Sequence, residues 1–442
     1  MKRELADYTL FPKIVPAGVH TRLILRPLGD HAAFRDAEYL VRFLPMCATL
    51  EGTGEDYASQ TARVREDGTL SFEHAFPGEQ AHIVRVFRLP PGGSSGGSSG
   101  GSSGDGTPES ALGSFLVYSL EPDLFALRPY RGDFHAHSSR SDGRESPAVV
   151  AANYRKSGFD FLAITDHHQW QPSEEAIQAF AGQPVDLKLF HGEEIHPPSN
   201  HVHMVAFGGA SSVNALFEND IGRYEREVAA LQSGLDVPPG VNAFEAASCA
   251  WVFDRIREVG GLGIYCHPYW ISDVYHVAEA FTDFLFETKP FDAFELLGGH
   301  EAHSNNVQTA YYQEARARGI TVPVVGSSDS HGTEDAQWFT WLSTVAFARD
   351  DSFDSIRESV LGLRSVAVEH YPGEAFRVHG PFRLVKYADF LLNEYFPLHD
   401  RLCEEEGRLM KGLACGDGSA VPLLALMQGR TAVFLERCFG NA

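Results

Sequence analysis

The chain has 442 residues, more than one average domain, and its 43% hydrophobic and 12% aromatic content can supply a large core. A formal net charge of −23 argues against a nucleic-acid backbone or an anionic membrane as the main partner, because both require clustered cations. A phosphorylated substrate is still allowed, since bound metal ions can invert the local field.

Two further features concern the cellular compartment. The six cysteines form no Cys-x-x-Cys pair and show no disulfide spacing, which is typical of reduced thiols in a cytosolic protein. The first residues contain no apolar signal-peptide core, and no stretch reaches about 18 uninterrupted apolar residues. We therefore expect a soluble, cytoplasmic protein.

Residues 1–128 alternate short apolar and polar runs with turn residues between them. This alternation predicts an all-β domain, most simply a small sandwich. Within it, residues 92–104 form a repeated Gly-Gly-Ser-Ser tract that has no side chains to bury and is typical of a flexible linker. Its perfect period indicates an engineered replacement of a natural loop that closes a hairpin, with a natural linker as the alternative.

From about residue 129 to 371, strands alternate with helices, a pattern that predicts an α/β protein with a parallel barrel. The strand candidates are 131–136, 159–165, 187–190, 202–207, 262–266, 291–297 and 322–325. One connection does not fit, because only about eight residues separate the strands near 190 and 202, too few for a crossover helix. Residues 372–442 are rich in helix formers and predict a largely helical extension.

Side chains that bind metals follow five of these strands. His135 and His137 are two residues apart at a strand end, so they face the same way, and the next turn can swing Asp142 back towards them. The pairs Asp166-His167 and Glu193-Glu194, with His267 and the segment Asp329–His331, occupy corresponding places after other strands. Nitrogen and oxygen ligands without thiolate suit Zn, Mn or Fe, so we predict a multinuclear site for divalent metal ions.

These ordered motifs resemble those of the PHP (polymerase and histidinol phosphatase) metallohydrolase superfamily. They read Asp133-Phe-His-Ala-His-Ser with Ser141-Asp-Gly, then Thr165-Asp-His, Gly192-Glu-Glu, Cys266-His-Pro and Ser328-Asp-Ser-His, within residues 131–333. The resemblance implies a distorted (β/α)7 TIM-like barrel with up to three metal ions at the carboxyl ends of its strands. The segment Tyr130–His135 and the N-terminal β domain are most similar to the CehA/McbA branch.

The resemblance also implies which residues bind each ion. The first ion would take His135, His137, Glu194 and Asp329; the second would share Glu194 and take His203 and His267; the third would take Asp142, His167 and His331. One position is ambiguous, because the general superfamily pattern favours His203 and the CehA-like pattern favours His201. We take His203 as the ligand and His201 as a substrate contact.

Other residues receive functional interpretations with a structural alternative beside each. Arg140 and Arg144 flank the Ser-Asp-Gly turn and could grip a phosphate, or simply lie in solvent. His168 is a candidate proton donor or a pocket-lining residue, and Trp270 is a candidate pocket wall or a packing residue.

Several metal ions together lower the pKa of a bridging water and neutralise a phosphoryl group. We therefore expect a metal-dependent phosphoesterase that hydrolyses phosphate mono- or diesters of a small molecule through metal-bound hydroxide, which Glu194 and Asp329 position. The alternatives are hydrolysis of carboxylic or carbamate esters at the same site, and a non-catalytic metal-binding module. The sequence leaves open the identity of the metal and whether the chain forms a homo-oligomer.

Overall fold

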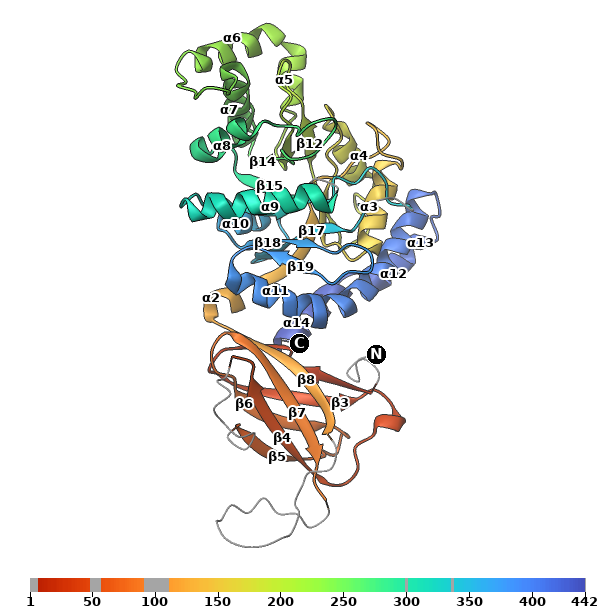
Figure 1. Cartoon of the computed structure of the whole chain (residues 1–442). Coiled ribbons are helices and arrows are strands. Elements are labelled where there is room, and N and C mark those ends of the chain that lie inside the picture. The colour runs from red at the N-terminus through yellow and green to blue at the C-terminus, as the bar shows by residue number, and fades with distance from the viewer. Residues whose placement is uncertain (1–6, 48–56, 91–110, 299–300, 335–337, 442) are drawn as a thin grey trace. The chain divides into compact units, whose positions relative to one another are not determined.

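The computed structural model describes residues 7–47, 57–90, 111–298, 301–334 and 338–441 of a mixed α/β protein (Figure 1). The chain divides into two compact units. The first unit comprises residues 1–126, 393–395 and 432–442, and the second comprises residues 127–392 and 396–431. The Gly/Ser tract at residues 92–104 lies outside the described residues.

The first unit contains two β-sheets. Its strands, red to orange in Figure 1, are β1 (Tyr8–Phe11), β2 (Ile14–Pro16), β3 (His20–Pro27), β4 (Glu38–Pro45), β5 (Ser59–Arg63), β6 (Leu70–Ala75), β7 (Gln80–Arg88) and β8 (Ala111–Leu120). One sheet has the order β1-β3-β6 and the other β2-β8-β7-β4-β5. Side chains alternate between buried and accessible along these strands, and the buried ones from both sheets form a single hydrophobic cluster. Two short helices, η1 (Asp30–Ala32) and α2 (Pro122–Phe125), complete the N-terminal segment.

Two further sheets form the second unit. The six-stranded sheet has the order β11-β10-β9-β17-β18-β19, and the five-stranded sheet has the order β12-β13-β14-β15-β16. The strands are β9 (Arg128–Asp133), β10 (Phe161–Ala163), β11 (Lys188–Phe190), β12 (Gly192–Ile195), β13 (Met204–Phe207), β14 (Leu262–Tyr265), β15 (Ala293–Leu297), β16 (Val324–Gly326), β17 (Leu342–Ala348), β18 (Ser365–Glu369) and β19 (Arg377–His379). Isolated parallel bridges, Ala136 to Ser330 and His167 to Glu194, link the two sheets. The strands thus form a curled, half-barrel sheet.

The strand directions differ from the expected parallel barrel. Strands β9, β10 and β11 are parallel to one another, as are β14, β15 and β16. However, β13 is antiparallel to both β12 and β14, and β17 is antiparallel to β9. For β12 and β13 the reason is the short connection between residues 195 and 204, which can join only an antiparallel pair. Strand β12 escaped prediction because its two glutamates interrupt the apolar pattern.

Helices accompany the strands of the second unit. They are α3 (Pro147–Lys156), α4 (Gln171–Ala179), α5 (Asn214–Asn219), α6 (Ile221–Gln232), α7 (Ala243–Glu258), α8 (Glu279–Thr288), α9 (Ala302–Ala317), α10 (Phe353–Leu361), α11 (Phe382–Glu394), α12 (Phe396–Ala414) and α13 (Ala420–Met427). The last helix, α14 (Arg430–Phe439), belongs mostly to the first unit. Helix α3 has Ser146 as its N-cap and Pro147 in its first turn. Within the described residues, no helix is both long and apolar enough to cross a membrane.

A buried arginine joins α3 to α12 in the second unit. The Arg155 guanidinium donates to Glu406 at 2.7 Å and to the Phe159 carbonyl at 3.0 Å, and it also lies 3.3 Å from Asp160. Arg155 and Glu406 are each 1% exposed. A buried ion pair of this kind is costly to break, because one charge is then left without compensation.

We predict that Arg155→Met lowers the free energy of unfolding of the second unit by about 3–5 kcal/mol, because Glu406 loses its buried cation. Urea unfolding followed by tryptophan fluorescence measures this unit, since all five tryptophans (residues 170, 251, 270, 338 and 341) belong to it. The control is Arg408→Met, which removes an exposed ion pair with Glu404 and should cost at most about 1 kcal/mol. Equal effects of the two substitutions would contradict the role given to Arg155.

Candidate metal centre

The ends of the curled sheet bring the predicted ligands together. His135 and His137 follow β9, His167 follows β10, His267 follows β14, and Asp329 follows β16. His203 precedes β13, and because β13 is antiparallel to β14, its amino end lies at the edge where β14 ends. Glu194 lies within β12. The directions of these strands therefore bring each of the histidine, aspartate and glutamate side chains to the same edge of the sheet.

The Glu194 carboxylate, which is fully buried, lies at the middle of the cluster. Its Oε1 is 2.8 Å from His203 Nδ1 and 3.7 Å from His267 Nε2. Its Oε2 is 2.6 Å from His167 Nδ1, 3.4 Å from His135 Nε2 and 3.5 Å from His137 Nε2. One carboxylate thus faces these five imidazoles, which come from four segments of the chain.

Asp329 lies opposite Glu194. Its Oδ1 is 2.9 Å from His137 Nε2 and 3.2 Å from His135 Nε2, and its Oδ2 is 3.8 Å from His267 Nε2. Asp329 has a φ of 50° and His267 a φ of 23°, backbone values that side-chain-bearing residues rarely adopt. Such strain persists where surrounding structure fixes the side chain, which fits residues aimed at a common point.

Asp142 forms a second, more accessible group. Its carboxylate is 3.3 Å from His331 Nε2, 3.4 Å from His167 Nε2 and 3.8 Å from His137 Nδ1. One potential ligand atom from each of these four residues lies within 4.8 Å of the others. His331 Nδ1 is 2.8 Å from the Asp329 carbonyl oxygen, so a proton on Nδ1 leaves the lone pair of Nε2 directed at Asp142.

Several buried polar atoms of the cluster lack hydrogen-bond partners. They are His135 Nε2, both Glu194 oxygens and both His267 ring nitrogens. The ring nitrogens near Glu194 have short distances but not hydrogen-bond geometry. Buried polar atoms without partners are costly, and a cation at the point where such lone pairs converge would compensate them. The residues therefore fit divalent metal ions bound by nitrogen and oxygen.

The electrostatics of Glu194 and His203 favour the ligating forms, whereas nearby carboxylates outweigh the effect of burial and raise the pKa of His135, His167 and His267. Burial opposes ionisation of Glu194, but His203 and His135 outweigh it and hold the Glu194 pKa well below its ordinary value. Burial lowers the pKa of His203 to about 4, which keeps this imidazole neutral at pH 7. An ionised carboxylate and a neutral imidazole are the forms that coordinate metals.

Two buried aspartates hold the ligand-bearing loops in place. Asp133 accepts hydrogen bonds from the backbone N–H groups of His135 and Ser328, each at 3.1 Å, and so joins the first ligand segment to the last. Asp166 accepts from the Ser138 N–H at 2.9 Å and the Ser138 hydroxyl at 2.6 Å. Gly143 is required in the turn between them, since a Cβ there would lie 2.8 Å from the His137 backbone.

Glu295 is a residue of this site that sequence reasoning missed. It is fully buried on β15; its Oε1 lies 2.9 Å from His135 Nδ1, and its Oε2 accepts from the His267 N–H at 3.1 Å. A proton on His135 Nδ1 leaves the lone pair of Nε2 directed at Glu194 and Asp329. The available signal was a glutamate within an apolar strand, where an uncompensated charge is costly.

Two further histidines extend the cluster. His196 Nε2 is 2.9 Å from His167 Nδ1, and the His196 ring lies 3.9 Å from the ring of His203. The His276 ring lies 4.3 Å from that of His203, and burial lowers the His276 pKa to about 2. No strand-end pattern marks His276, which lies in an irregular loop.

The remaining predicted residues lie around the rim. Trp270 lies beside the cluster, with its ring 5.9 Å from that of His267, and the exposed His168 lies 4.7 Å from the His196 ring. The structure places the other three outside the cluster. Arg140 is paired with Glu175 at 2.7 Å, His201 with Glu245 at 3.0 Å, and Arg144 is exposed.

Comparison with curated protein sequences gives a short match. No family model matches the chain. A stretch of 54 residues, 12% of this chain, is 41% identical to the DNA polymerase/3′-5′ exonuclease PolX of Bacillus subtilis (strain 168). The stretch covers only 10% of that relative, so it does not extend to the whole protein.

Solved structures give longer but distant matches. One is a two-domain protein from Bacteroides vulgatus ATCC 8482 that contains a predicted PHP-like metal-dependent phosphoesterase, with 18% identity over 55% of this chain and 66% of that chain and a TM-score of 0.39. Another, from Bifidobacterium adolescentis ATCC 15703, is described as a metal-dependent phosphoesterase, with 20% identity over 46% and 88% and a TM-score of 0.33. A third is an amidohydrolase from Chromobacterium violaceum with bound sulfate, with 19% identity over 47% and 89% and a TM-score of 0.32.

We predict that His203→Ala lowers the amount of tightly bound metal, whereas His201→Ala does not. His203 lies 2.8 Å from Glu194 with 14% of its side chain exposed, while His201 is 53% exposed and paired with Glu245. The measurement is metal content by mass spectrometry after loading with Zn²⁺ or Mn²⁺ and dialysis. Loss of metal from His201→Ala, with His203→Ala unaffected, would reverse the assignment.

We also predict that Glu295→Gln weakens metal binding by about 10–100-fold, the range for loss of a group that orients a ligand. The amide that replaces the Glu295 carboxylate has one oxygen instead of two, so it cannot accept from both the His135 imidazole and the His267 backbone N–H. Competition with a chelating dye measures the affinity. The control is Glu174→Gln, which removes a similar contact to His191 away from the cluster, and equal effects of the two changes would refute the orienting role of Glu295.

Proposed function

We propose that this chain is a metal-dependent hydrolase of the PHP superfamily, CehA/McbA-like branch, that cleaves phosphate mono- or diesters of a small molecule. The observation that carries the proposal is the convergence of imidazoles and carboxylates from separate strand ends on the buried, unpartnered oxygens of Glu194. The proposal includes a distorted seven-stranded barrel for the second unit and a β-sandwich for the first. A cytoplasmic location also belongs to it.

The proposed ligands divide into three groups that share members. His135, His137, Glu194 and Asp329 would hold one ion, Glu194 with His203 and His267 a second, and Asp142, His167 and His331 a third. Divalent Mn, Zn or Fe at these places would supply Lewis acidity, lowering the pKa of a water and compensating phosphoryl charge.

The chain itself would orient the reactants. Asp329, 5% exposed, and Glu194, fully buried, offer carboxylate oxygens that can accept hydrogen bonds from the attacking water and fix its direction. His168 at the rim is our candidate for the group that protonates the leaving oxygen. Burial lowers the His168 pKa, so this role requires the negative charge of the bound substrate to raise it again.

The substrate proposal rests on charge and on one similarity. The short match to a protein named as a 3′-5′ exonuclease supports phosphodiester chemistry. The net charge of −23 disfavours a long polynucleotide, so a small phosphorylated molecule fits better. Because Arg140 pairs with Glu175, a phosphate contact from Arg140 would require that ion pair to open, and Arg144 is the more available of the two.

Hydrolysis of a carboxylic or carbamate ester is the second candidate, and the loop after Trp270 favours it. The side chains of Ile271, Val274 and Tyr275 in this loop are 42%, 74% and 43% exposed. Apolar side chains beside the cluster suit an apolar leaving group better than a sugar or a nucleotide.

We predict metal-dependent hydrolysis of p-nitrophenyl phosphate or bis(p-nitrophenyl) phosphate, lost with a chelator and restored by Mn²⁺ or Zn²⁺. Asp329→Asn should lower kcat by roughly 10²–10³-fold, the range for removing one preorganised electrostatic group. His201→Ala serves as the control, since His201 is paired with Glu245 outside the cluster, and we expect kcat to stay within about threefold of the unmodified protein.

Parallel assays with p-nitrophenyl acetate and an aryl N-methylcarbamate separate the two candidates. Turnover of these esters without turnover of either phosphate would replace the phosphoesterase proposal with the second one. If none of the four substrates is turned over by chain that has bound metal, the remaining interpretation is a non-catalytic metal-binding module.

A further inference from the structure

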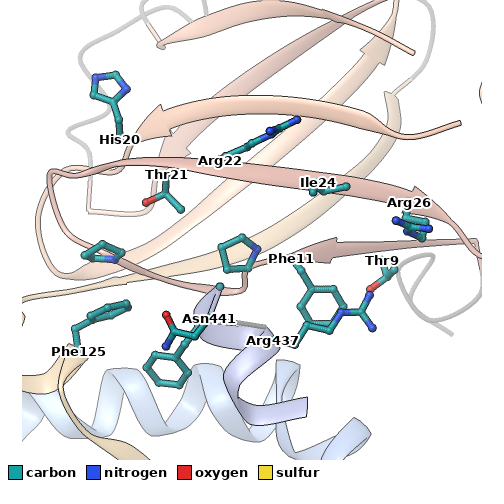
Figure 2. A pocket seen from close by; sticks show the side chains of 14 residues that line it. Thr9, Phe11, His20, Thr21, Arg22, Ile24, Arg26, Phe125, Arg437 and Asn441 are labelled. Carbon is teal, nitrogen blue, oxygen red and sulfur yellow. The ribbon is translucent and has the colours of Figure 1, made fainter. Parts of the chain in front are cut away.

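A large open groove lies within the first unit, formed by residues that the metal centre does not use (Figure 2). Its floor is the outward face of β1 and β3, and its other walls come from α2 and residues 437–441. The volume is about 910 Å³. This lies within the range of about 300–1,000 Å³ that is typical of ligand pockets.

Three arginines line the groove, although the chain as a whole is strongly acidic. His20, Arg22 and Arg26 lie along β3, and Arg437 approaches from the C-terminal segment. Among the described residues, no carboxylate lines the groove, although the whole chain carries a net charge of −23. A concave site of one sign attracts a ligand of the opposite sign, so this groove complements an anion.

Two carboxylates lie near the arginines of β3. Glu73 on β6 is opposite Arg22 in the strand register, and Asp67 is close enough for Arg26 to help lower its pKa, after the larger effect of hydrogen bonds from Thr69. Arg22 donates from Nε to the Ser71 hydroxyl at 2.8 Å, which fixes its side chain on the sheet face. The cations are thus partly balanced at the rim, and the interior of the groove keeps its positive sign.

Apolar rings form the remaining surface of the groove. The guanidinium carbon of Arg437 lies 4.1 Å from the centre of the Phe11 ring, and the rings of Phe125 and Phe439 are 5.5 Å apart. A guanidinium stacked on a ring still presents its N–H edge to an acid group. Ile24, between Arg22 and Arg26 on the same face of β3, is 38% exposed, so an inorganic anion alone would leave apolar surface in water.

The spacing of the arginines favours an organic ligand over a single small ion. Arg22 and Arg26 are four residues apart on one strand, hence about 13 Å apart along it at about 3.3 Å per residue. With the Arg22 side chain held by the Ser71 hydroxyl, one sulfate or phosphate at the Arg26 end does not contact both guanidinium groups. A molecule with an acid group at one end and a ring system in the middle can meet an arginine and the apolar side chains together.

We propose that this groove is a binding site for an organic anion in which an acid group is attached to an apolar ring system. The acid group pairs with Arg26 and Arg437 at the Phe11 end, and the ring lies on Phe11 and Ile24. The site is independent of the histidine cluster, because all the residues that line it belong to the first unit.

Calorimetric titration of the full chain with naphthalene-2-sulfonate tests the proposal. Inorganic sulfate supplies the charge alone and naphthalene-2-methanol the ring alone, and each should bind more weakly by about tenfold or more. The sulfonate affinity should be the same with chelator and with metal, because the groove contains no predicted metal ligand. Equal affinity for sulfate or for the neutral alcohol would overturn the proposal, as would no sulfonate binding at all.

Two variants locate the bound probe. Arg26→Gln with Arg437→Gln should weaken sulfonate binding by about tenfold or more, and Ile24→Glu, on an exposed face, should do so without altering the melting temperature. The matched control is Arg85→Gln, on β7, which does not line the groove; it removes a hydrogen bond to Ser114, and affinity should not change. Wild-type affinity in both groove variants would show that the probe binds elsewhere and would overturn the proposal.

Discussion

The constraint on which the second unit depends is the burial of negative charge at the ends of its strands. Asp133, Asp166, Glu193, Glu194 and Glu295 are all fully buried. Four of them have ordinary hydrogen-bond donors, as in Glu193, which accepts from Ser212, Asn214 and the Val213 N–H. Glu194 differs, because imidazole nitrogens surround it without hydrogen-bond geometry. A cation bound beside the Glu194 oxygens would supply the missing partner.

The same constraint explains where the backbone is strained. His168, His267 and Asp329 all have positive φ, and all three follow buried strands at the edge where the ligands meet. Apolar residues from the neighbouring strands pack into continuous clusters beneath this edge. The packed strands below therefore hold loops that would relax in isolation, and rigidity of the sheet is what allows ligands from distant segments to converge.

Sequence patterns predicted which strand ends carry metal-binding side chains, and these ends do meet. Strand direction was not predictable, since periodicity reports which face is buried and not which way a neighbour runs. Strand β12 was hidden because Glu193 and Glu194 are charged yet buried. Glu295 was passed over because it follows no motif, and the choice between His201 and His203 needed the distances to Glu194 and Glu245. All of these features depend on contacts between residues that are distant in the sequence.

The first unit is built from segments that are distant in sequence, and this has a consequence for the order of folding. Residues 432–442 belong to the same unit as residues 1–126, and the Lys13 N–H donates to the carbonyl of Cys438 at 2.9 Å. During synthesis, the N-terminal strands leave the ribosome long before the helix that completes their unit. The second unit lies between residues 126 and 432, interrupted only by residues 393–395, so it can finish folding first, and the first unit closes only when residues 432–442 emerge.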